Sequence, residues 1–391
     1  MTSFLTHFGN SGEQIYHYFA PGRINLIGEH IDYNGGWVMP FAISRGIHAT
    51  VRFAAPRSDG SFLLRFRSQQ AEGELYIDSQ DPQAFERRLL SWMNYPLGIV
   101  SALHKDWGLA LPCADVFFDS DLPMQSGLSS SAAMEALTLY LFLHHLDHPF
   151  SEDRTRLALF CQQVERQFVG VNCGIMDQFA VLQGRRGHVL LLHCDTLQCE
   201  YVPFVPEGFA ILAFNTNKPR ALVESKYNER RSECEAALQL IQSHGRTINN
   251  LCDANIDDLA YIERAVLRSR ALHVIGENER VQGAAIEILK KNWAKTGKLL
   301  SKSHDSLSKN YEVTGYELDL LVGLLRQTKG CIGERMTGAG FGGCAIALVE
   351  RSAVDECKNS VKLMYDKITG LSLDAFEVSP SDGVRFLGVY E

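Results

Sequence analysis

The segment LPMQSGLSSSA, residues 122–132, is the most informative stretch of this sequence for the fold. It follows ADVFFDSD, a predicted strand that starts at Ala114, and it precedes SAAMEALTLYLFLHHLD, residues 131–147. The second stretch is apolar on nearly every face, and its length favours a buried helix over a strand. Backbone N–H groups at the start of a helix carry partial positive charge, which suits a phosphate group. The serine-rich loop therefore predicts a phosphate-binding turn.

Two other interpretations of this loop fit less well. An ordinary serine N-cap needs a single hydroxyl, whereas consecutive serines occupy residues 129–131. The GxxxxGK[ST] pattern does not occur, so the loop is not of the Walker type. The additional hydroxyls supply hydrogen-bond donors and a candidate Mg²⁺ ligand.

A second glycine-rich segment, TGAGFGGCAIAL, begins at Thr337. Gly338, Gly340 and Gly343 satisfy GxGxxG, but a dinucleotide-binding turn precedes a helix, whereas these glycines precede a predicted strand. A protein-kinase glycine loop does precede a strand, yet the sequence contains no HRD or DFG motif. The segment therefore predicts a turn that lets the backbone approach a ligand closely.

Charged residues cluster in PGRINLIGEHIDYNGG, residues 21–36. Arg23, Glu29, His30 and Asp32 stand among glycines and apolar residues, whereas a surface helix would spread such charges at helical spacing. The cluster predicts that a polar ligand binds here.

A further acid lies in GVNCGIMDQFA, which begins at Gly170. Asp177 is the acid of this otherwise apolar segment. It is either a helix N-cap or a functional acid placed in a cleft.

Composition limits the possible partners and compartment. The net charge of −8 and the absence of a lysine or arginine block argue against a nucleic-acid partner. Apolar runs such as FAILAF, from Phe209, fall well short of the roughly 18 residues of a membrane span, and the N-terminus resembles no secretory signal. The 10 cysteines form no CxxC pair, so we expect them to be reduced and the protein to be a cytoplasmic enzyme without a structural metal.

The order of predicted elements favours the α+β class, because strands dominate the first half and helices the second. The longest predicted helices start at Val223 and at Glu277, where ENERVQGAAIEILKKNWAKTGKLL is treated as one helix. We expect an N-terminal domain over residues 1–195 and a C-terminal domain over residues 196–391, although no proline-rich linker marks the border.

Four segments together resemble the galactokinases, in the same order and spacing: GRINLIGEHIDY, GLSSSAA, CGIMDQF and MTGAGFGGC. The resemblance extends from Pro21 to about Cys344 and places the chain in the GHMP superfamily of small-molecule kinases. It implies a two-domain fold with the active site in the interdomain cleft. The implied reaction transfers the γ-phosphoryl of MgATP to the anomeric hydroxyl of α-D-galactose. The products are galactose 1-phosphate and ADP, in the first step of galactose catabolism.

The resemblance also implies roles for individual residues. Asp177 matches the catalytic base, and Arg23 matches the arginine that stabilises charge during transfer and keeps that aspartate ionised. The residues that match sugar contacts are Glu29, His30, Asp32, Gly174 and Tyr227. Ser131 and Glu165 match the Mg²⁺ ligands. The residues that match the phosphate-binding loop are Pro123, Met124, Gln125, Ser126, Gly127, Leu128, Ser129, Ser130 and Ser131.

Elementary chemistry agrees with these roles. Phosphoryl transfer needs alignment and charge neutralisation, which anion-binding amides, a metal, a cationic side chain and an acid can supply. Carboxylates and amides pair with sugar hydroxyls. A buried carboxylate oxygen left unpaired by the wrong stereoisomer costs about 1–3 kcal/mol.

The sequence departs from the family pattern at three positions. Many relatives carry small residues where this chain has Gln125 and Ser126, which bears on the nucleotide contacts. Ile31 replaces the threonine common in galactokinases, and N-acetylgalactosamine kinases often have HIDY as well. The CGIMDQF segment, by contrast, has the galactokinase form.

Alternatives to this interpretation stay open at the level of the sequence. The chain is an active galactokinase, a kinase for N-acetylgalactosamine, arabinose or galacturonate, or a sugar- and ATP-binding regulator without catalysis. Regulatory paralogues lose residues just after the serine run, whereas SSSAA is intact here. Purely structural roles are a salt bridge between Arg23 and Asp32, a core position for His30, and solvated positions for Tyr227 and Glu165. We expect no nucleic-acid or membrane partner and a monomer or weak dimer.

Overall fold

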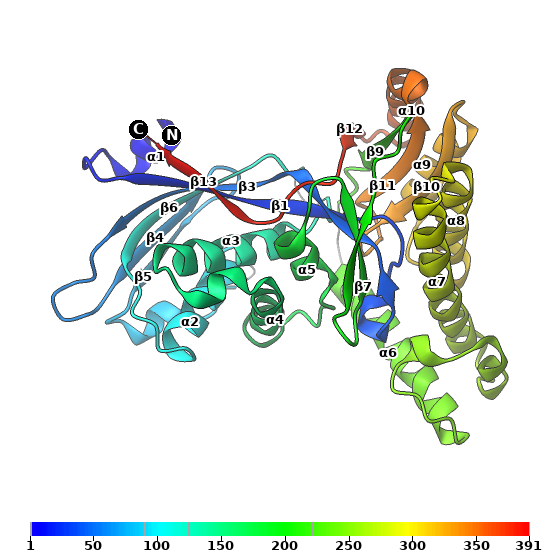
Figure 1. Cartoon of the computed structure of the whole chain (residues 1–391), viewed down its shortest axis with the longest axis horizontal. Helices are drawn as coiled ribbons and strands as arrows, with labels where there is room; N and C mark the ends of the chain where they lie inside the picture. The colour runs from blue at the N-terminus through cyan, green and yellow to red at the C-terminus, as the bar shows by residue number, and fades with distance from the viewer. Residues whose placement is uncertain (1, 90, 124–125, 220–222, 391) are drawn as a thin grey trace.

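The largest sheet of the molecule holds the long strands of the N-terminal half (Figure 1). The computed structural model describes every residue except 1, 90, 124–125, 220–222 and 391. The strands of this sheet lie in the order β13 (Arg385–Tyr390), β1 (Ile15–Asn25), β3 (Pro40–Ala54), β6 (Cys113–Ser120), β4 (Leu63–Ser68) and β5 (Glu74–Asp78). Neighbours are antiparallel except β4 and β6, which are parallel.

A group of helices lies on one side of this sheet, some of them against the strands and the others packed on those helices (Figure 1). They are α2 (Asn94–Lys105), α3 (Ser130–His145), α4 (Arg154–Val164) and α5 (Met176–Gln183). The short N-terminal helix α1 (Thr2–Phe8) packs separately, since Phe4 and Phe8 form a small apolar cluster with Ile15 and Phe117.

The second sheet belongs to the C-terminal half. Its antiparallel strands lie in the order β10 (Cys331–Thr337), β11 (Cys344–Glu350), β9 (Phe209–Asn215) and β12 (Asp374–Val378). The helices that pack on it are α8 (Trp293–Ser306), α9 (Tyr316–Gln327) and α10 (Val354–Thr369). The helix α7 (Ala265–Leu289) packs on α8, and α6 (Val223–Ser243) packs on α7. A small third sheet joins β2 (Trp37–Val38), β7 (His188–His193) and β8 (Cys199–Pro203). The predicted α+β class is confirmed.

One predicted helix is wrong. The stretch from Glu277 to Leu300 is broken between α7 and α8, where Lys291 has a positive φ of 55°. The side chain of Asn292 accepts a hydrogen bond from the backbone N–H of Lys295 and so caps α8. An asparagine that caps a new helix competes with continuation of the preceding one.

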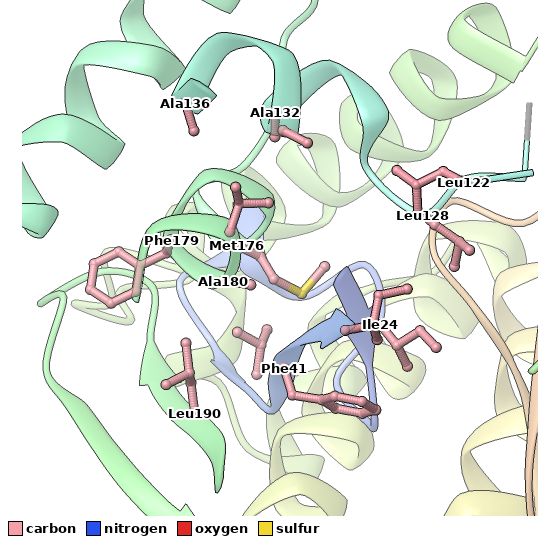
Figure 2. Close-up of a cluster of buried hydrophobic side chains, with 14 of the residues drawn as sticks. Ile24, Phe41, Leu122, Leu128, Ala132, Ala136, Met176, Phe179, Ala180 and Leu190 are labelled. Atoms are coloured by element: carbon pink, nitrogen blue, oxygen red, sulfur yellow. The ribbon is translucent and has the colours of Figure 1, made fainter. Parts of the chain in front are cut away.

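The core beneath the cleft fixes the orientation of α5 (Figure 2). Met176, Phe179 and Ala180 lie on one face of this helix and are buried against Ala132 and Ala136 of α3, Ile24 of β1 and Phe41 of β3. Residues spaced by three and four share a helix face, so Asp177 is directed to another side of α5. Packing of the apolar stripe therefore fixes the direction of the acid.

No helix among the described residues is both long and apolar enough to cross a membrane.

Candidate active site

A cleft of about 200 Å³ brings together sequence motifs that are far apart in the chain. It contains every residue predicted as catalytic or as a sugar contact. These residues are Arg23, Glu29, His30, Asp32, Gly174, Asp177 and Tyr227. Glu165 also lines the cleft, as do Gly338 and Ala339 of the glycine-rich segment predicted to approach a ligand. The lining residues that were not singled out from the sequence are Gly170, Val171, Asn172, Cys173, Met176 and Asn228.

Arg23 and Asp177 form a two-pronged ion pair in this cleft. The guanidinium donates from Nε to Oδ1 and from Nη2 to Oδ2, both over 2.7 Å. Nη1 donates to the carbonyl oxygen of Gly127, also over 2.7 Å. The arginine side chain is buried, whereas that of the aspartate is 29% exposed toward the cleft. Such paired bonds fix the relative orientation of the two groups.

Ser129 links the serine loop to the same carboxylate. It precedes the first turn of α3 with a positive φ of 62°, and its hydroxyl makes no capping hydrogen bond. The hydroxyl donates instead to Oδ2 of Asp177 over 2.5 Å. A non-glycine residue in this conformation costs about 1–3 kcal/mol and tends to occur at functional sites.

The rest of the predicted phosphate loop lies around this link. The carbonyl oxygens of Gly127 and Leu128 both accept hydrogen bonds from Arg23, so the loop backbone is fixed to β1. Pro123 borders a separate cavity of about 620 Å³. Met124 and Gln125 lie outside the described residues.

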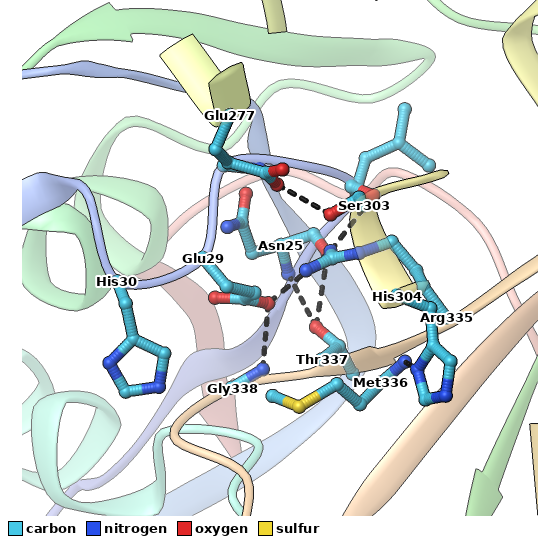
Figure 3. A network of polar contacts seen from close by, with 12 residues as sticks. Asn25, Glu29, His30, Glu277, Ser303, His304, Arg335, Met336, Thr337 and Gly338 are labelled. Atoms are coloured by element: carbon cyan, nitrogen blue, oxygen red, sulfur yellow. Dashed lines mark hydrogen bonds and ion pairs between the residues drawn. The ribbon is translucent and has the colours of Figure 1, made fainter. Parts of the chain in front are cut away.

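Glu29 is held from the C-terminal half of the chain (Figure 3). Its Oε1 accepts from the backbone N–H of Gly338 over 2.7 Å and from Nη1 of Arg335 over 3.4 Å. Arg335 is fully buried and also donates to the carbonyl oxygens of Asn25 and Leu26, each over 3.0 Å. Burial raises the pKa of Glu29, although the neighbouring arginines oppose this. The sequence indicated Glu29 but gave no signal for Arg335.

A second buried acid, Glu277 of α7, holds the same segment. It accepts from the backbone N–H of Gly28 over 3.0 Å, from the hydroxyl of Ser303 over 2.5 Å and from Nε of Arg280 over 2.7 Å. Burial opposes ionisation, but Arg280 and other cations outweigh it and lower the pKa of Glu277 to about 2. Residues 25–30 are thus shaped by groups from the C-terminal half.

Asp32 and Gly174 lie against each other in the lining of the cleft. A Cβ on Gly174 would collide with the carboxylate of Asp32, so no larger residue fits there without movement. Burial, and then the charge of Asp177, raise the pKa of Asp32 to about 7. A carboxyl group with such a pKa can both donate and accept hydrogen bonds near neutral pH.

His30 lies beside them with both ring nitrogens engaged. Nδ1 lies 2.9 Å from the Tyr33 hydroxyl, and Nε2 lies 3.1 Å from the carbonyl oxygen of Ala339. Burial lowers the pKa of His30 to about 3. The ring of Tyr227 is 5.6 Å from that of His30.

Glu165 and Ser131 are the residues of this region that fit a cation. The Ser131 hydroxyl is hydrogen-bonded to the Glu165 carboxylate, which also accepts from Nε2 of Gln178 over 2.5 Å. Burial and Asp177 raise the pKa of Glu165 to about 7. The described part of the chain holds no group of three or more His, Cys, Asp or Glu arranged for a metal. Two oxygen donors nevertheless suit Mg²⁺, which keeps several waters and takes further ligands from substrate phosphates.

Family comparisons give consistent results along the chain. Residues 2–53 match the galactokinase galactose-binding signature. Residues 94–185 match the N-terminal domain of GHMP kinases, and residues 284–367 match their C-terminal domain.

Curated proteins similar to this chain include two galactokinases. That of Clostridium tetani is 43% identical over 357 residues, which cover 90% of this chain and 88% of the relative. That of Exiguobacterium sibiricum is 41% identical, with 98% of this chain and 96% of the relative covered.

Solved structures that resemble this chain also include a galactokinase. Lactococcus lactis galactokinase, crystallised with galactose, is 36% identical and superimposes with a TM-score of 0.90, covering 99% of this chain and 98% of that one. Methanococcus jannaschii mevalonate kinase is 18% identical, with a TM-score of 0.64 over 95% of this chain and 100% of that one, and shares the fold.

Proposed function

The chain belongs to the galactokinase family, and from this premise we propose that it transfers the γ-phosphoryl group of ATP to the C1 hydroxyl of α-D-galactose. The products are galactose 1-phosphate and ADP. The observation that carries the proposal is the cleft in which the Arg23–Asp177 pair faces acidic side chains suited to a sugar.

Asp177 acts on the sugar hydroxyl. A carboxylate has about four lone-pair positions, and the hydrogen bonds from Arg23 and Ser129 leave room for a further donor. As the bond from O1 of the sugar to the γ-phosphorus forms, the hydroxyl proton passes to Asp177. The bond from the γ-phosphorus to the bridging oxygen breaks, and ADP leaves.

Arg23 neutralises charge at the reacting centre. Its guanidinium is fixed by Asp177 and Gly127, so little reorganisation is needed when phosphate oxygens approach. A preorganised cation of this kind stabilises the transition state more than the bound substrate.

The sugar is recognised by the remaining polar side chains of the cleft. The residues proposed to contact its hydroxyls are Glu29, His30, Asp32, Gly174 and Tyr227. Ile31, one of the departures from the family pattern, is fully buried and does not line the cleft, so its effect on the sugar would be indirect.

The nucleotide is proposed to bind through the serine loop, residues 123–131. Ser131 and Glu165 would hold Mg²⁺, which when bound neutralises phosphate charge. The acidic pair formed by Glu165 and Asp177 would lose its mutual repulsion on binding a divalent cation.

We also propose the domain borders, the compartment and the oligomeric state of the enzyme. The N-terminal domain comprises residues 1–195 and the C-terminal domain residues 196–391, with β13 returning to the first sheet. The enzyme works in the cytoplasm, as a monomer or weak dimer.

A coupled ADP-release assay across a sugar panel tests the function. The panel contains galactose, N-acetylgalactosamine, arabinose, galacturonate and glucose, with and without Mg²⁺. We expect the highest kcat/KM with galactose. A preference for another sugar would reassign the substrate, and sugar binding without ADP release would make the chain a regulator.

A further inference from the structure

A chain of hydrogen bonds runs from the cleft into the core of the C-terminal half. Nδ1 of His30 lies 2.9 Å from Oη of Tyr33, which lies 2.8 Å from Oη of Tyr311. That hydroxyl in turn lies 3.1 Å from Sγ of Cys234 on α6. His30, Tyr311 and Cys234 are each at most 3% exposed. The sequence indicated His30, and Tyr33 ends the GRINLIGEHIDY segment, but no pattern pointed to Tyr311 or Cys234.

The direction of every bond in this chain can be worked out from its end in the cleft. The partner of Nε2 is the carbonyl oxygen of Ala339, which can only accept, so Nε2 carries a proton. Burial lowers the pKa of His30 to about 3, so the ring is neutral and Nδ1 is bare.

The donor in each remaining hydrogen bond follows from the bare Nδ1. The Tyr33 hydroxyl must donate to the bare Nδ1, so the Tyr311 hydroxyl must donate to Tyr33. The Cys234 thiol must then donate to Tyr311. Each hydroxyl and the thiol has one proton, so for a neutral ring this arrangement is the one that satisfies all these contacts, whereas an imidazolium would reverse the bonds from Nδ1 to Cys234.

We infer that Tyr33, Tyr311 and Cys234 are positioning residues that hold the His30 ring in one orientation, with its Nε2–H directed to the wall of the cleft as a hydrogen-bond donor. The inference rests on the proposed function, because it assigns His30 a donor role toward a sugar oxygen. Ala339 lines the same cleft, so a sugar oxygen can share this proton with its carbonyl in a three-centre bond. His30 is neither a base nor a cation in the reaction.

Without the chain the ring would not be fixed. Removal of the Tyr33 hydroxyl leaves Nδ1 buried and unpaired, and the two-fold torsion of the imidazole then lets the ring turn over. Loss of the Tyr311 hydroxyl should disturb the ring orientation less, because Tyr311 contacts Tyr33 and reaches His30 only through it.

The first test is ¹⁵N NMR of the full-length protein with labelled histidine, in which His30 is assigned by its loss in His30→Gln. We expect a neutral ring protonated at Nε2 from about pH 5 to about pH 8. In Tyr33→Phe the Nδ1 signal should move to that of a nitrogen without a hydrogen bond. A wild-type ring protonated at Nδ1, or an imidazolium, would overturn the inference.

The second test is kinetic. Tyr33→Phe should raise the KM for galactose about three- to tenfold, the change expected for one ordinary hydrogen bond, with kcat and the KM for ATP little altered. Tyr311→Phe should raise the KM for galactose by a smaller factor. This variant replaces Tyr33→Phe in the test if Tyr33→Phe does not fold. An unchanged galactose KM in both variants, or an equal rise in the KM for ATP, would contradict a positioning role.

Tyr18→Phe is the matched control. Tyr18 is fully buried, and its hydroxyl lies 3.2 Å from Nδ1 of His144, away from the cleft. The control should lose stability but keep the galactose KM and the His30 signal. Since the NMR measurement needs no substrate, its failure is distinguishable from failure of the proposed function, which the sugar panel tests with the wild-type enzyme.

Discussion

Arg23 and Asp177 are 154 residues apart in the chain and meet through two hydrogen bonds of 2.7 Å. The arginine comes from the end of β1, and the acid comes from the first turn of α5. Ser129 and Gly127 of the serine loop join the pair directly. The ion pair therefore joins β1, the serine loop and α5, which are proposed to serve sugar recognition, phosphate binding and acid–base chemistry.

Asp177→Ala is expected to reduce kcat by at least about a hundredfold, because general-base assistance is worth roughly 10²–10⁴-fold. Nucleotide affinity should change little, since the serine loop is proposed to bind the phosphates. Steady-state kinetics and equilibrium nucleotide binding check the two statements. Asp177→Asn, which keeps the side-chain shape beside Arg23, controls for misfolding. A near-normal kcat in Asp177→Ala would show that Asp177 is not the general base.

Arg23→Ala should lower kcat by about 10²–10³-fold and raise the galactose KM much less, because charge on the transferring group develops mainly in the transition state. The matched control is Arg351→Ala, in which an exposed arginine loses its ion pair with Glu377. An effect confined to KM would mean that Arg23 serves substrate binding alone.

Gly174→Ala should weaken galactose binding at least tenfold, since the new methyl group would meet the Asp32 carboxylate. Gly323→Ala is the control, because no atom lies near a Cβ added at this position in α9. The control should gain about 0.5–1 kcal/mol of stability from better helix propensity. Sugar titrations and denaturant unfolding measure these effects, and unchanged galactose affinity in Gly174→Ala would contradict the placement of Asp32.

Stability should depend on pH through Asp32. Its pKa rises from 3.8 to about 7 on folding, so between these values the folded protein binds the proton more tightly than the unfolded chain. Stability therefore falls as the pH rises through this window, and the penalty is complete above about pH 7. Asp32→Asn should raise Tm over wild type more at about pH 8 than at about pH 4. Parallel Tm profiles for the two proteins would show that burial of the charge is not costly.

Arg335→Met should destabilise the protein by about 3–5 kcal/mol, because it leaves buried acceptors of Asn25, Leu26 and Glu29 without their cationic partner. Denaturant unfolding of the full chain provides the measurement. The conservative variant Arg335→Lys should recover part of the loss. Wild-type stability in Arg335→Met would show that residues 25–29 hold their shape unaided.

The sequence was most informative where local pattern and function coincide. The buried helix α3, predicted over residues 131–147, follows from the apolar content of that stretch. The motif residues lining the cleft were identified through the resemblance, because four short segments share one order. Strand β1 was not predicted, since its proline, glycine and arginine conceal a buried strand.

The residues that contact the site from distant parts of the chain could not be predicted from the sequence. Arg335 and Glu277 look like ordinary residues of a strand and a helix, and their burial emerges only when the two halves of the chain pack together. Tyr311 lies 278 residues after Tyr33, so no local spacing relates them. The break between α7 and α8 occurs because Asn292 caps α8 instead of continuing α7. An asparagine is compatible with either conformation, so the sequence alone did not reveal the break.

The most direct test of the central claim is ³¹P NMR of the product formed by the wild-type protein from MgATP and galactose. The account predicts a sugar phosphate whose phosphorus couples to the anomeric proton, formed in step with ADP, and no such product with Asp177→Ala. A phosphate on any other hydroxyl, or ATP hydrolysis without a sugar phosphate, would contradict it.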